Sequence, residues 1–392
     1  MNGRTDFPRF ETRCQLPDTP RGGAHPDPHG ALGYPIYQTA TFAHRGLDDP
    51  GDFDYTRMQN HTRERLEQAV RALEGGVDAL AFTSGMAAVS AVMELFEPGD
   101  HLIVDDDLYG GSARLFNTIN RKNGLVFTAV NCAEDDIAPH IGPRTRAVFL
   151  ETPTNPMMRV TDLERLAAVT RRRGLTLIVD NTFLSPYLQN PLALGADIVI
   201  HSGTKYLGGH NDTICGLAVT ASETLAARLR HILKTTGAGL SPFDSWLILR
   251  GLKTLAVRMD RAQENALVLA RFLKERRQVT RVIYPGLPEH PGHAIMKKQA
   301  RGFGAMLVFE TANRDLARAV LERVRVIRFA ESLGGTETLI TYPVTQTHAD
   351  VPPDQLARNG VTDRLLRLSV GIEHVADLQA DLAAALEEGG RP

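Results

Sequence analysis

From residue 62 onward the chain alternates short apolar segments with amphipathic segments of helical length, and this alternation constrains the fold most. Apolar runs of this length are typical of buried strands, and the intervening pattern is typical of helices that cover a sheet. Parallel strands need long crossover connections, which are usually helices, so the pattern predicts a doubly wound, mainly parallel α/β sheet. We expect strands at 78–82, 101–105, 125–130, 146–150, 175–180, 196–201 and 214–220. We expect helices at 63–73, with Thr62 as the N-cap, from Ser84 onward, at 112–122 and at 163–173.

The pattern changes at two places along the chain, which predicts three regions. Residues 1–60 are rich in Pro, Gly, His and Asp and carry little periodicity, so we expect an arm that contacts a neighbouring subunit. Residues 61–255 form the predicted large domain. Two helical stretches, 222–236 and 242–277, lead into residues 256–392, whose mixed order of strands and helices predicts a smaller α+β domain.

Charge and cysteine usage exclude several classes of protein. With 44 basic and 46 acidic side chains the net charge is −2, which argues against a nucleic-acid binder. The most apolar stretch, 79–96, contains Ser84, Gly85 and Glu94 and is better explained by a strand, a turn and a helix than by a membrane span. The cysteines Cys14, Cys132 and Cys215 are odd in number and far apart, and the first residues lack an apolar signal core. We therefore expect a cytoplasmic protein that acts on small molecules, without a disulfide framework.

The residues that follow the predicted strands indicate where the chemistry lies, because ligands of open α/β sheets bind at the carboxyl ends of the strands. Lys205 is the only one of the seven lysines that directly follows a buried strand. A lysine in that position can be desolvated and become nucleophilic toward an aldehyde. Position alone leaves a second interpretation equally open, in which Lys205 caps a strand end at the surface.

Asp180, at the end of the strand 175–180, favours the first interpretation. A buried carboxylate needs a partner, and a protonated pyridine nitrogen is one. An aspartate for a pyridinium and a lysine for a Schiff base are the paired requirements of pyridoxal phosphate (PLP) chemistry. Ser84-Gly85-Met86 at a helix start offers N–H groups to a phosphate, although such a start is more often a plain N-cap. Ser202 and Thr204, which flank the lysine, could add hydroxyl donors.

Eight motifs along the chain are distinctive in combination. They are SGMAA at 84–88, ETPTNP at 151–156, VDNTF at 179–183, HSGTKY at 201–206, SPFDS at 241–245, RGLKTL at 250–255, ESLGG at 331–335 and RLSVGIE at 367–373. Together they resemble the Cys/Met-metabolism family of PLP-dependent enzymes, which includes the cystathionine γ-synthases and γ-lyases. The resemblance runs from about residue 30 to the C-terminus, and it implies PLP fold type I and a homotetramer of two active dimers.

The resemblance also implies a role for each matching residue. Lys205 would bind the cofactor covalently and move protons, Asp180 would pair with the pyridinium, and Tyr109 would stack on its ring. The phosphate would be held by Gly85, Met86, Ser202 and Thr204, with Tyr55 and Arg57 of the neighbouring chain. Arg367, with Asn155 and the backbone near Ser332, would bind the α-carboxylate of the substrate. An arginine suits this task because its planar fork meets a carboxylate with two parallel hydrogen bonds.

Positions around the substrate favour chemistry at Cγ of homoserine-derived amino acids. Glu331 resembles the residue that faces the distal amino group of cystathionine or cysteine, and Asp54 resembles the γ-synthases. Arg114 could receive a distal carboxylate, and Gly111 stands where methionine γ-lyases carry cysteine. The interpretation is therefore a cystathionine γ-synthase of methionine biosynthesis, with γ-lyase as the alternative. O-acylhomoserine sulfhydrylase and methionine γ-lyase remain further alternatives, and a non-catalytic relative or an aminotransferase would be a different class.

Two residues in the segment before the helix expected at 63–73 depart from the family pattern. The chain has Asn60-His61-Thr62 where most members have Asn-Pro-Thr, which places a titratable ring near the predicted rim of the site. The preceding Gln59 replaces the commoner glycine.

The pairs His25/His29 and His290/His293 lie in Pro- and Gly-rich segments without a carboxylate pattern, so we expect solvated histidines and no metal site.

Overall fold

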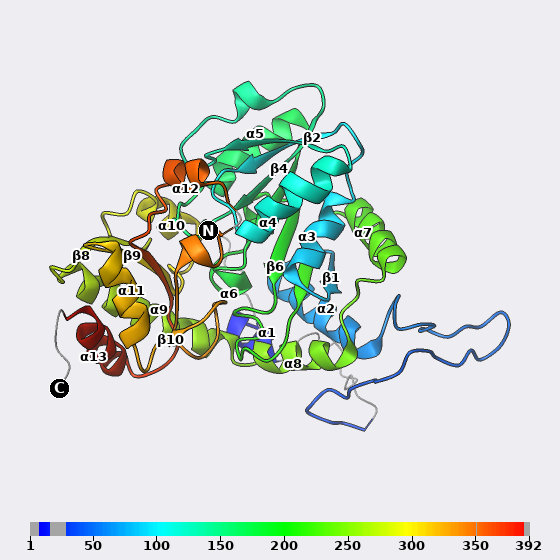
Figure 1. The fold of residues 1–392 in the computed structure, drawn as a ribbon. Helices are drawn as coiled ribbons and strands as arrows, with labels where there is room; N and C mark the ends of the chain where they lie inside the picture. The colour runs from blue at the N-terminus through cyan, green and yellow to red at the C-terminus, as the bar shows by residue number, and fades with distance from the viewer. Residues whose placement is uncertain (1–7, 16–28, 350, 388–392) are drawn as a thin grey trace, which may run out of the picture. The chain divides into compact units, whose positions relative to one another are not determined.

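The computed structural model describes residues 8–15, 29–349 and 351–387 (Figure 1). It comprises two compact units, one of Met1–Leu95 with Asp197–Ala256 and one of Phe96–Ala196 with Val257–Pro392. A seven-stranded sheet has the order β1-β7-β6-β5-β4-β2-β3, and a five-stranded sheet has the order β10-β11-β12-β9-β8. The predicted α/β class, a mainly parallel sheet with a separate smaller α+β part, is confirmed.

The first unit pairs three strands and surrounds them with helices. Strand β7 runs antiparallel to both β1 and β6. Helix α2 packs on β1 and α8, and α3 packs on β7 and β6. The elements are α1 (Phe10–Gln15), α2 (His61–Glu74), β1 (Asp78–Phe82), α3 (Gly85–Met93), β6 (Ile198–Ser202), β7 (Gly216–Thr220), α7 (Glu223–Thr236) and α8 (Pro242–Leu252).

The second unit begins with four parallel strands, in which β2 pairs with β3 and β4 and β4 pairs with β5. The interior residues of β2, β4 and β5 are buried Ala, Val, Ile, Leu and Phe, as expected where helices cover both faces of a parallel sheet. Strand β3, at the edge of the sheet, is more exposed, and Val130 is its buried residue. The elements are β2 (His101–Asp105), α4 (Gly110–Leu115), the π-helix η1 (Phe116–Asn120), β3 (Val126–Val130), η2 (Ala138–His140), β4 (Thr145–Glu151), α5 (Leu163–Arg173), β5 (Thr176–Asp180), α6 (Ser185–Leu188) and η3 (Pro191–Leu194).

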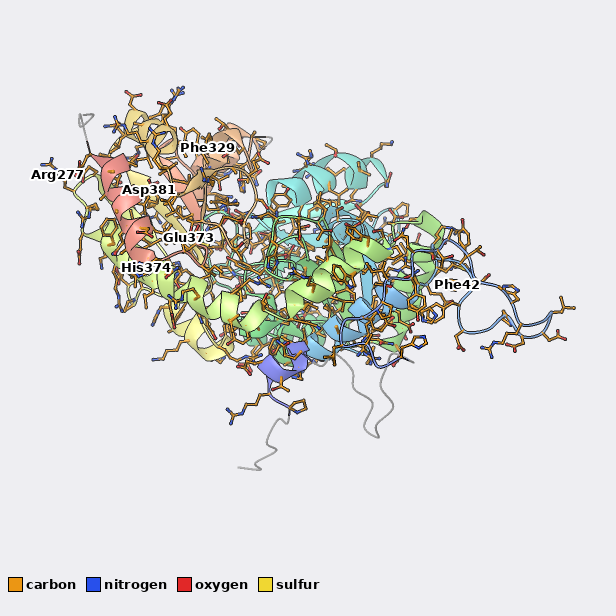
Figure 2. The ribbon with its side chains drawn as sticks, turned by 90° about the horizontal axis from the view of Figure 1, so that it is seen from below. Phe42, Arg277, Phe329, Glu373, His374 and Asp381 are labelled. Carbon is orange, nitrogen blue, oxygen red and sulfur yellow. The ribbon has the colours of Figure 1, made fainter. Side chains whose placement is uncertain are left out.

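The remainder of the second unit builds the smaller, mostly antiparallel sheet. Helices α11 and α13 pack against each other (Figure 1). On α13, Asp381 (Figure 2) accepts the backbone N–H groups of residues 325, 326 and 327 at 2.8–3.1 Å, which ties that helix to the chain before β10. The elements are α9 (Leu255–Lys274), β8 (Val279–Ile283), α10 (His293–Gln299), β9 (Met306–Thr311), α11 (Arg314–Arg323), β10 (Arg328–Phe329), β11 (Leu339–Thr341), η4 (Pro343–Thr345), α12 (Pro353–Asn359), β12 (Leu365–Ser369) and α13 (Val375–Leu386).

Four local predictions are wrong. The helix expected at 63–73 begins at His61, because Asn60 rather than Thr62 is the N-cap and accepts from the N–H groups of Thr62 and Arg63. The segment 1–60 is not wholly irregular, since it contains α1. The helix expected at 112–122 starts at Gly110 and becomes a π-helix at Phe116. The stretch 242–277 is two helices, broken at residues 253–254.

Candidate functional site

The N-terminus of α3 packs closely on the end of β6. Ser84 is the N-cap and accepts the N–H of Ala87 at 3.0 Å. A Cβ at Gly85 would lie 3.0 Å from Cβ of Ser202 and 3.2 Å from its Oγ, which is tighter than ordinary contact. Glycine therefore lets the helix start approach the strand end, and it leaves a small cradle of first-turn N–H groups beside a serine hydroxyl. Such a cradle favours an anion such as a phosphate.

Lys205 lies in the turn that follows β6. Its backbone N–H donates to the Ser202 carbonyl at 3.1 Å, and its own carbonyl accepts the N–H of Gly209 at 2.7 Å. The Thr204 hydroxyl accepts the N–H of Cys215 at 3.0 Å and lies 3.2 Å from the Cys215 carbonyl. These bonds fix the turn and place a half-buried amine directly after a buried strand. Donation from Thr204 to a phosphate would therefore compete with the Cys215 carbonyl.

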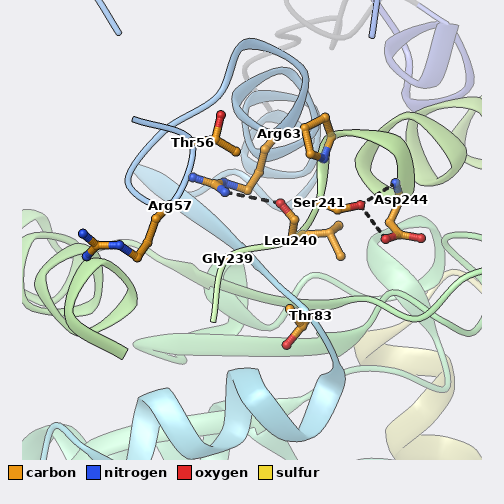
Figure 3. Close-up of a pocket in the computed structure, with 9 residues that line it drawn as sticks. Thr56, Arg57, Arg63, Thr83, Gly239, Leu240, Ser241 and Asp244 are labelled. Atoms are coloured by element: carbon orange, nitrogen blue, oxygen red, sulfur yellow. Dashed lines mark hydrogen bonds between the residues drawn. The ribbon is translucent and has the colours of Figure 1, made fainter. Parts of the chain in front are cut away.

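Tyr55 and Arg57 lie in the segment before α2. The Arg57 guanidinium is 5.6 Å from the centre of the Tyr55 ring, and its Nη1 donates to the Lys234 carbonyl at 2.7 Å. Tyr55 is 42% exposed, so its ring is accessible. Arg57 also lines a cavity of about 270 Å³ with Arg63, whose Nη1 donates to the Leu240 carbonyl at 3.2 Å (Figure 3). The preceding Asp54 accepts from His44 at 3.1 Å.

His61 packs into an aromatic cluster. Its ring lies 3.6 Å from the ring of Phe53 and 4.5 Å from that of Tyr37, measured between ring centres. Burial lowers the pKa of His61, and the charge of Asp52 opposes this shift. The imidazole therefore acts as a flat packing group at the position where the family usually has proline, and it anchors the segment before α2.

Asp180 and Glu151 end neighbouring strands of the second unit. They are register partners in the parallel pair of β5 and β4. Asp180 Oδ1 accepts the N–H of Thr182 at 2.9 Å, which turns the chain after the strand. Glu151 is 6% exposed. Burial raises the pKa of the Glu151 carboxyl, and the charge of Asp180 raises it further.

Tyr109 precedes α4 and is 40% exposed. Its N–H donates to Oε1 of Glu151 at 2.8 Å. Arg114 lies on α4 with an exposed side chain, just before the helix becomes π-helical. Gly111 is buried on the same helix.

Arg367 is the most deeply buried cation of the predicted site. It lies on β12 with no exposed surface, its Nη1 donates to Oδ1 of Asn155 at 2.8 Å, and its Nη2 donates to the Ser332 carbonyl at 3.0 Å. Ser332 has φ of 97°, a strained conformation for a residue other than glycine. The strained backbone presents its carbonyl to the guanidinium. Three predicted residues from distant parts of the chain thus meet in this unit.

Glu331 is exposed and directly precedes Ser332. It is therefore covalently attached to the residue whose carbonyl fixes Arg367. A carboxylate here can contact a ligand group that lies beyond one bound to Arg367.

The sequence did not identify His348, which contacts the backbone carbonyl of Asn155. Its Nε2 lies 3.0 Å from the Asn155 carbonyl, and its Nδ1 lies 2.8 Å from the Thr347 hydroxyl. Burial, together with the charge of Arg367, lowers the pKa of His348 to about 4. The ring is therefore neutral, donates from Nε2 and accepts at Nδ1. No periodicity or motif in the sequence marks this histidine.

The residues present fit pyridoxal phosphate. The first unit contains the anion cradle at Gly85 and the amine of Lys205. The second unit contains the strand-end carboxylate of Asp180, the accessible ring of Tyr109 and the buried guanidinium of Arg367. Within the described ranges there is no group of three or more metal-ligating side chains, and no helix is long and apolar enough to cross a membrane.

Comparisons with known proteins agree with this chemistry. The model of the Cys/Met metabolism PLP-dependent enzyme family matches residues 20–387. The chain is 45% identical to a cystathionine beta-lyase of Lactococcus lactis over 360 residues, covering 92% of this chain and 95% of that protein. It is 48% identical to a cystathionine gamma-synthase/O-acetylhomoserine (thiol)-lyase of Bacillus subtilis over 358 residues, covering 91% and 92%.

A solved structure gives the same result. The cystathionine gamma-lyase of Lactobacillus plantarum superposes with a TM-score of 0.92 at 42% identity, covering 96% of this chain and 98% of that one. The resemblance to PLP fold type I is thereby confirmed, as is the prediction of a PLP-dependent enzyme of carbon–sulfur lyase and transferase chemistry. The chain belongs to the Cys/Met-metabolism family of PLP-dependent enzymes.

Proposed function

We propose that the protein is a cystathionine γ-synthase, which joins an O-acylhomoserine to cysteine by replacement at Cγ. The observation that carries this proposal is the attachment of Glu331 to Ser332, whose carbonyl holds Arg367. An amino acid whose α-carboxylate binds Arg367 can place a distal ammonium group near Glu331. Cystathionine carries such a distal amino group, which comes from the cysteine that is joined to the homoserine part, whereas methionine does not carry one.

The chain's own residues have complementary tasks in this proposal. The cofactor, when bound, withdraws electrons from Cα of the substrate. Asp180 keeps the pyridine nitrogen protonated, the cradle of Gly85, Met86 and Ser202 holds the phosphate, and Thr204 contributes where its bond to Cys215 allows. Lys205 binds the cofactor between turnovers and moves protons between Cα and the outer carbons, so that a leaving group departs from Cγ.

The outer part of the site orients the substrate. Arg367 with Asn155 and Ser332 binds the α-carboxylate, and Tyr109 stacks on the ring. Arg114 would meet a distal carboxylate, such as a succinyl group, and Asp54 lies beside Tyr55. We further propose a cytoplasmic homotetramer in which Tyr55 and Arg57 serve the phosphate of the neighbouring chain; the accessibility of Tyr55 supports this.

The experiment that tests the function is a product assay with purified, PLP-loaded protein. O-succinyl- and O-acetylhomoserine are supplied with and without cysteine, and cystathionine and 2-oxobutanoate are quantified. We expect cystathionine to form at the expense of 2-oxobutanoate once cysteine is present. A parallel incubation with cystathionine alone decides between the alternatives. Cysteine with 2-oxobutanoate would indicate a γ-lyase, homocysteine with pyruvate a β-lyase, and either without synthesis would overturn the proposal.

Glu331→Ala tests the distal contact. Loss of a charge-assisted contact costs about 1.5–3 kcal/mol, so we expect KM for cysteine to rise roughly tenfold or more, while cofactor affinity stays constant. KM for the O-acylhomoserine should change much less. Glu322→Ala, on the exposed face of α11, is the matched control. Equal KM values for cysteine in the two variants would remove the reason to prefer cystathionine chemistry.

A further inference from the structure

Glu151 is a buried carboxyl group that the proposed mechanism leaves without a task. It is the last residue of β4 and is 6% exposed. Its register partner on β5 is Asp180. Neighbouring strands lie about 4.8 Å apart and register partners share a face, so the two side chains are adjacent.

A hydrogen bond joins Glu151 to the loop before α4. Oε1 accepts the N–H of Tyr109 at 2.8 Å, across 42 positions of the chain. Tyr109 is the N-cap residue of α4 and has no side-chain cap of its own. One carboxyl group therefore connects the residue whose ring stacks on the cofactor with the strand edge that carries Asp180.

The surroundings of Glu151 are acidic. Asp180, Asp107 and Asp105 all face it, and within the described part of the chain no cation lies at ion-pair distance from it. Arg159, which faces Asp105 and Asp107, is paired with Asp106 at 2.8 Å. Two adjacent carboxylates in a buried site cannot both ionise without a large cost. Burial and these charges raise the pKa of Glu151, so they favour its protonated form.

We propose that Glu151 is a positioning residue that, as a neutral carboxyl group, fixes Tyr109 relative to Asp180. Its neutrality leaves Asp180 as the ionised member of this register pair, where the pyridinium needs the negative charge. An ionised Glu151 would repel that charge and draw a proton onto Asp180. The inference rests on the proposed roles of Tyr109 and Asp180.

Glu151→Gln and Glu151→Ala separate positioning from bulk stability. Glutamine replaces a protonated carboxyl group with a neutral isostere that still accepts from Tyr109, so we expect kcat and the circular dichroism of the bound cofactor to stay within about threefold of the parent. Alanine leaves the Tyr109 N–H without its acceptor, so we expect kcat to fall about tenfold or more, KM to change less, and the cofactor signal to weaken. Glu310→Gln, at a 6% exposed glutamate of β9, is the matched control and should change neither.

Two measurements do not depend on cofactor or activity. At neutral pH the infrared spectrum of the cofactor-free parent should show a protonated-carboxyl band. We expect this band to be absent in Glu151→Gln and to be unchanged in Glu310→Gln. Because the pKa of Glu151 is raised in the folded state, the folded protein holds this proton more tightly than the unfolded chain does. The resulting stabilisation is complete below pH 4.5, the ordinary pKa of glutamate, and is lost as the pH rises from there through the raised pKa. The Tm of Glu151→Gln relative to the parent should therefore increase with pH across that window.

The outcomes distinguish this inference from the proposed function. If the parent bound no cofactor, the proposed function would fail, while the infrared band and the Tm difference would still report on the neutral carboxyl group. If the parent is active but Glu151→Gln loses activity as far as Glu151→Ala, the negative charge is required and the inference is overturned. An infrared spectrum that does not change in Glu151→Gln would overturn it as well.

Discussion

Lys205→Ala is expected to lose at least about 10³-fold in turnover, because both nucleophilic binding of the cofactor and proton transfer depend on this amine. The turn after β6 holds its backbone through Ser202 and Gly209, so removing the side chain should leave the fold intact. Cofactor affinity should fall less than turnover, since the phosphate cradle at Gly85 and Ser202 is retained. Turnover with the O-acylhomoserine and the visible absorbance of the bound cofactor measure the two effects separately.

Two further variants test whether the loss of turnover is specific to the primary amine of Lys205. Lys205→Arg keeps the positive charge but cannot bind an aldehyde as a primary amine does, and it should be as inactive as Lys205→Ala. Lys297→Ala, an exposed lysine on α10, should keep full turnover. Borohydride reduction followed by peptide mapping should attach the cofactor to the peptide that contains Lys205. Undiminished turnover in Lys205→Ala would overturn the assignment of the catalytic base.

The strands and the strand-end residues could be predicted from sequence because their signals are local. A run of buried apolar residues identifies a strand such as β5, and the residue that ends it, Asp180, is then at the functional edge. Lys205 stands out because its flanks differ from those of every other lysine. The family motifs added the roles of Arg367 and Asn155, which periodicity alone does not assign.

The missed residues act through contacts between distant parts of the chain. His348 reaches Asn155 across 193 positions, and Glu151 reaches Tyr109 across 42. Each is one polar residue in a segment whose pattern gives no sign of its partner. The start of α2 was missed for a different reason, since Asn60 and Thr62, two positions apart, both suit an N-cap and only the backbone conformation decides. Tertiary contacts of this kind decide which buried polar groups support the site.

Arg367→Lys carries the second large expected effect. Lysine keeps the charge but loses the fork that donates to Asn155 and Ser332, so both a bidentate contact with the α-carboxylate and the fixed direction of the cation are lost. The cost of about 1.5–3 kcal/mol corresponds to roughly a 10–100-fold rise in KM for every amino-acid substrate. Unlike Glu331→Ala, this change should affect the O-acylhomoserine and cysteine alike.

A pair of ligands shows whether the carboxylate is the group that Arg367 recognises. The parent should bind an amino-acid inhibitor more tightly than the matching amine without the carboxylate, and Arg367→Lys should remove most of that preference while binding the amine as before. Arg364→Lys, at a partly exposed arginine just before β12, should keep the preference, because its guanidinium faces Glu310 at 3.8 Å rather than Asn155. Because Arg367 is fully buried, a melting curve must first show that the variant is folded. A folded Arg367→Lys variant that still prefers the amino acid to the same degree would show that the α-carboxylate binds elsewhere. Glu331 would then no longer be expected to lie beyond the bound carboxylate.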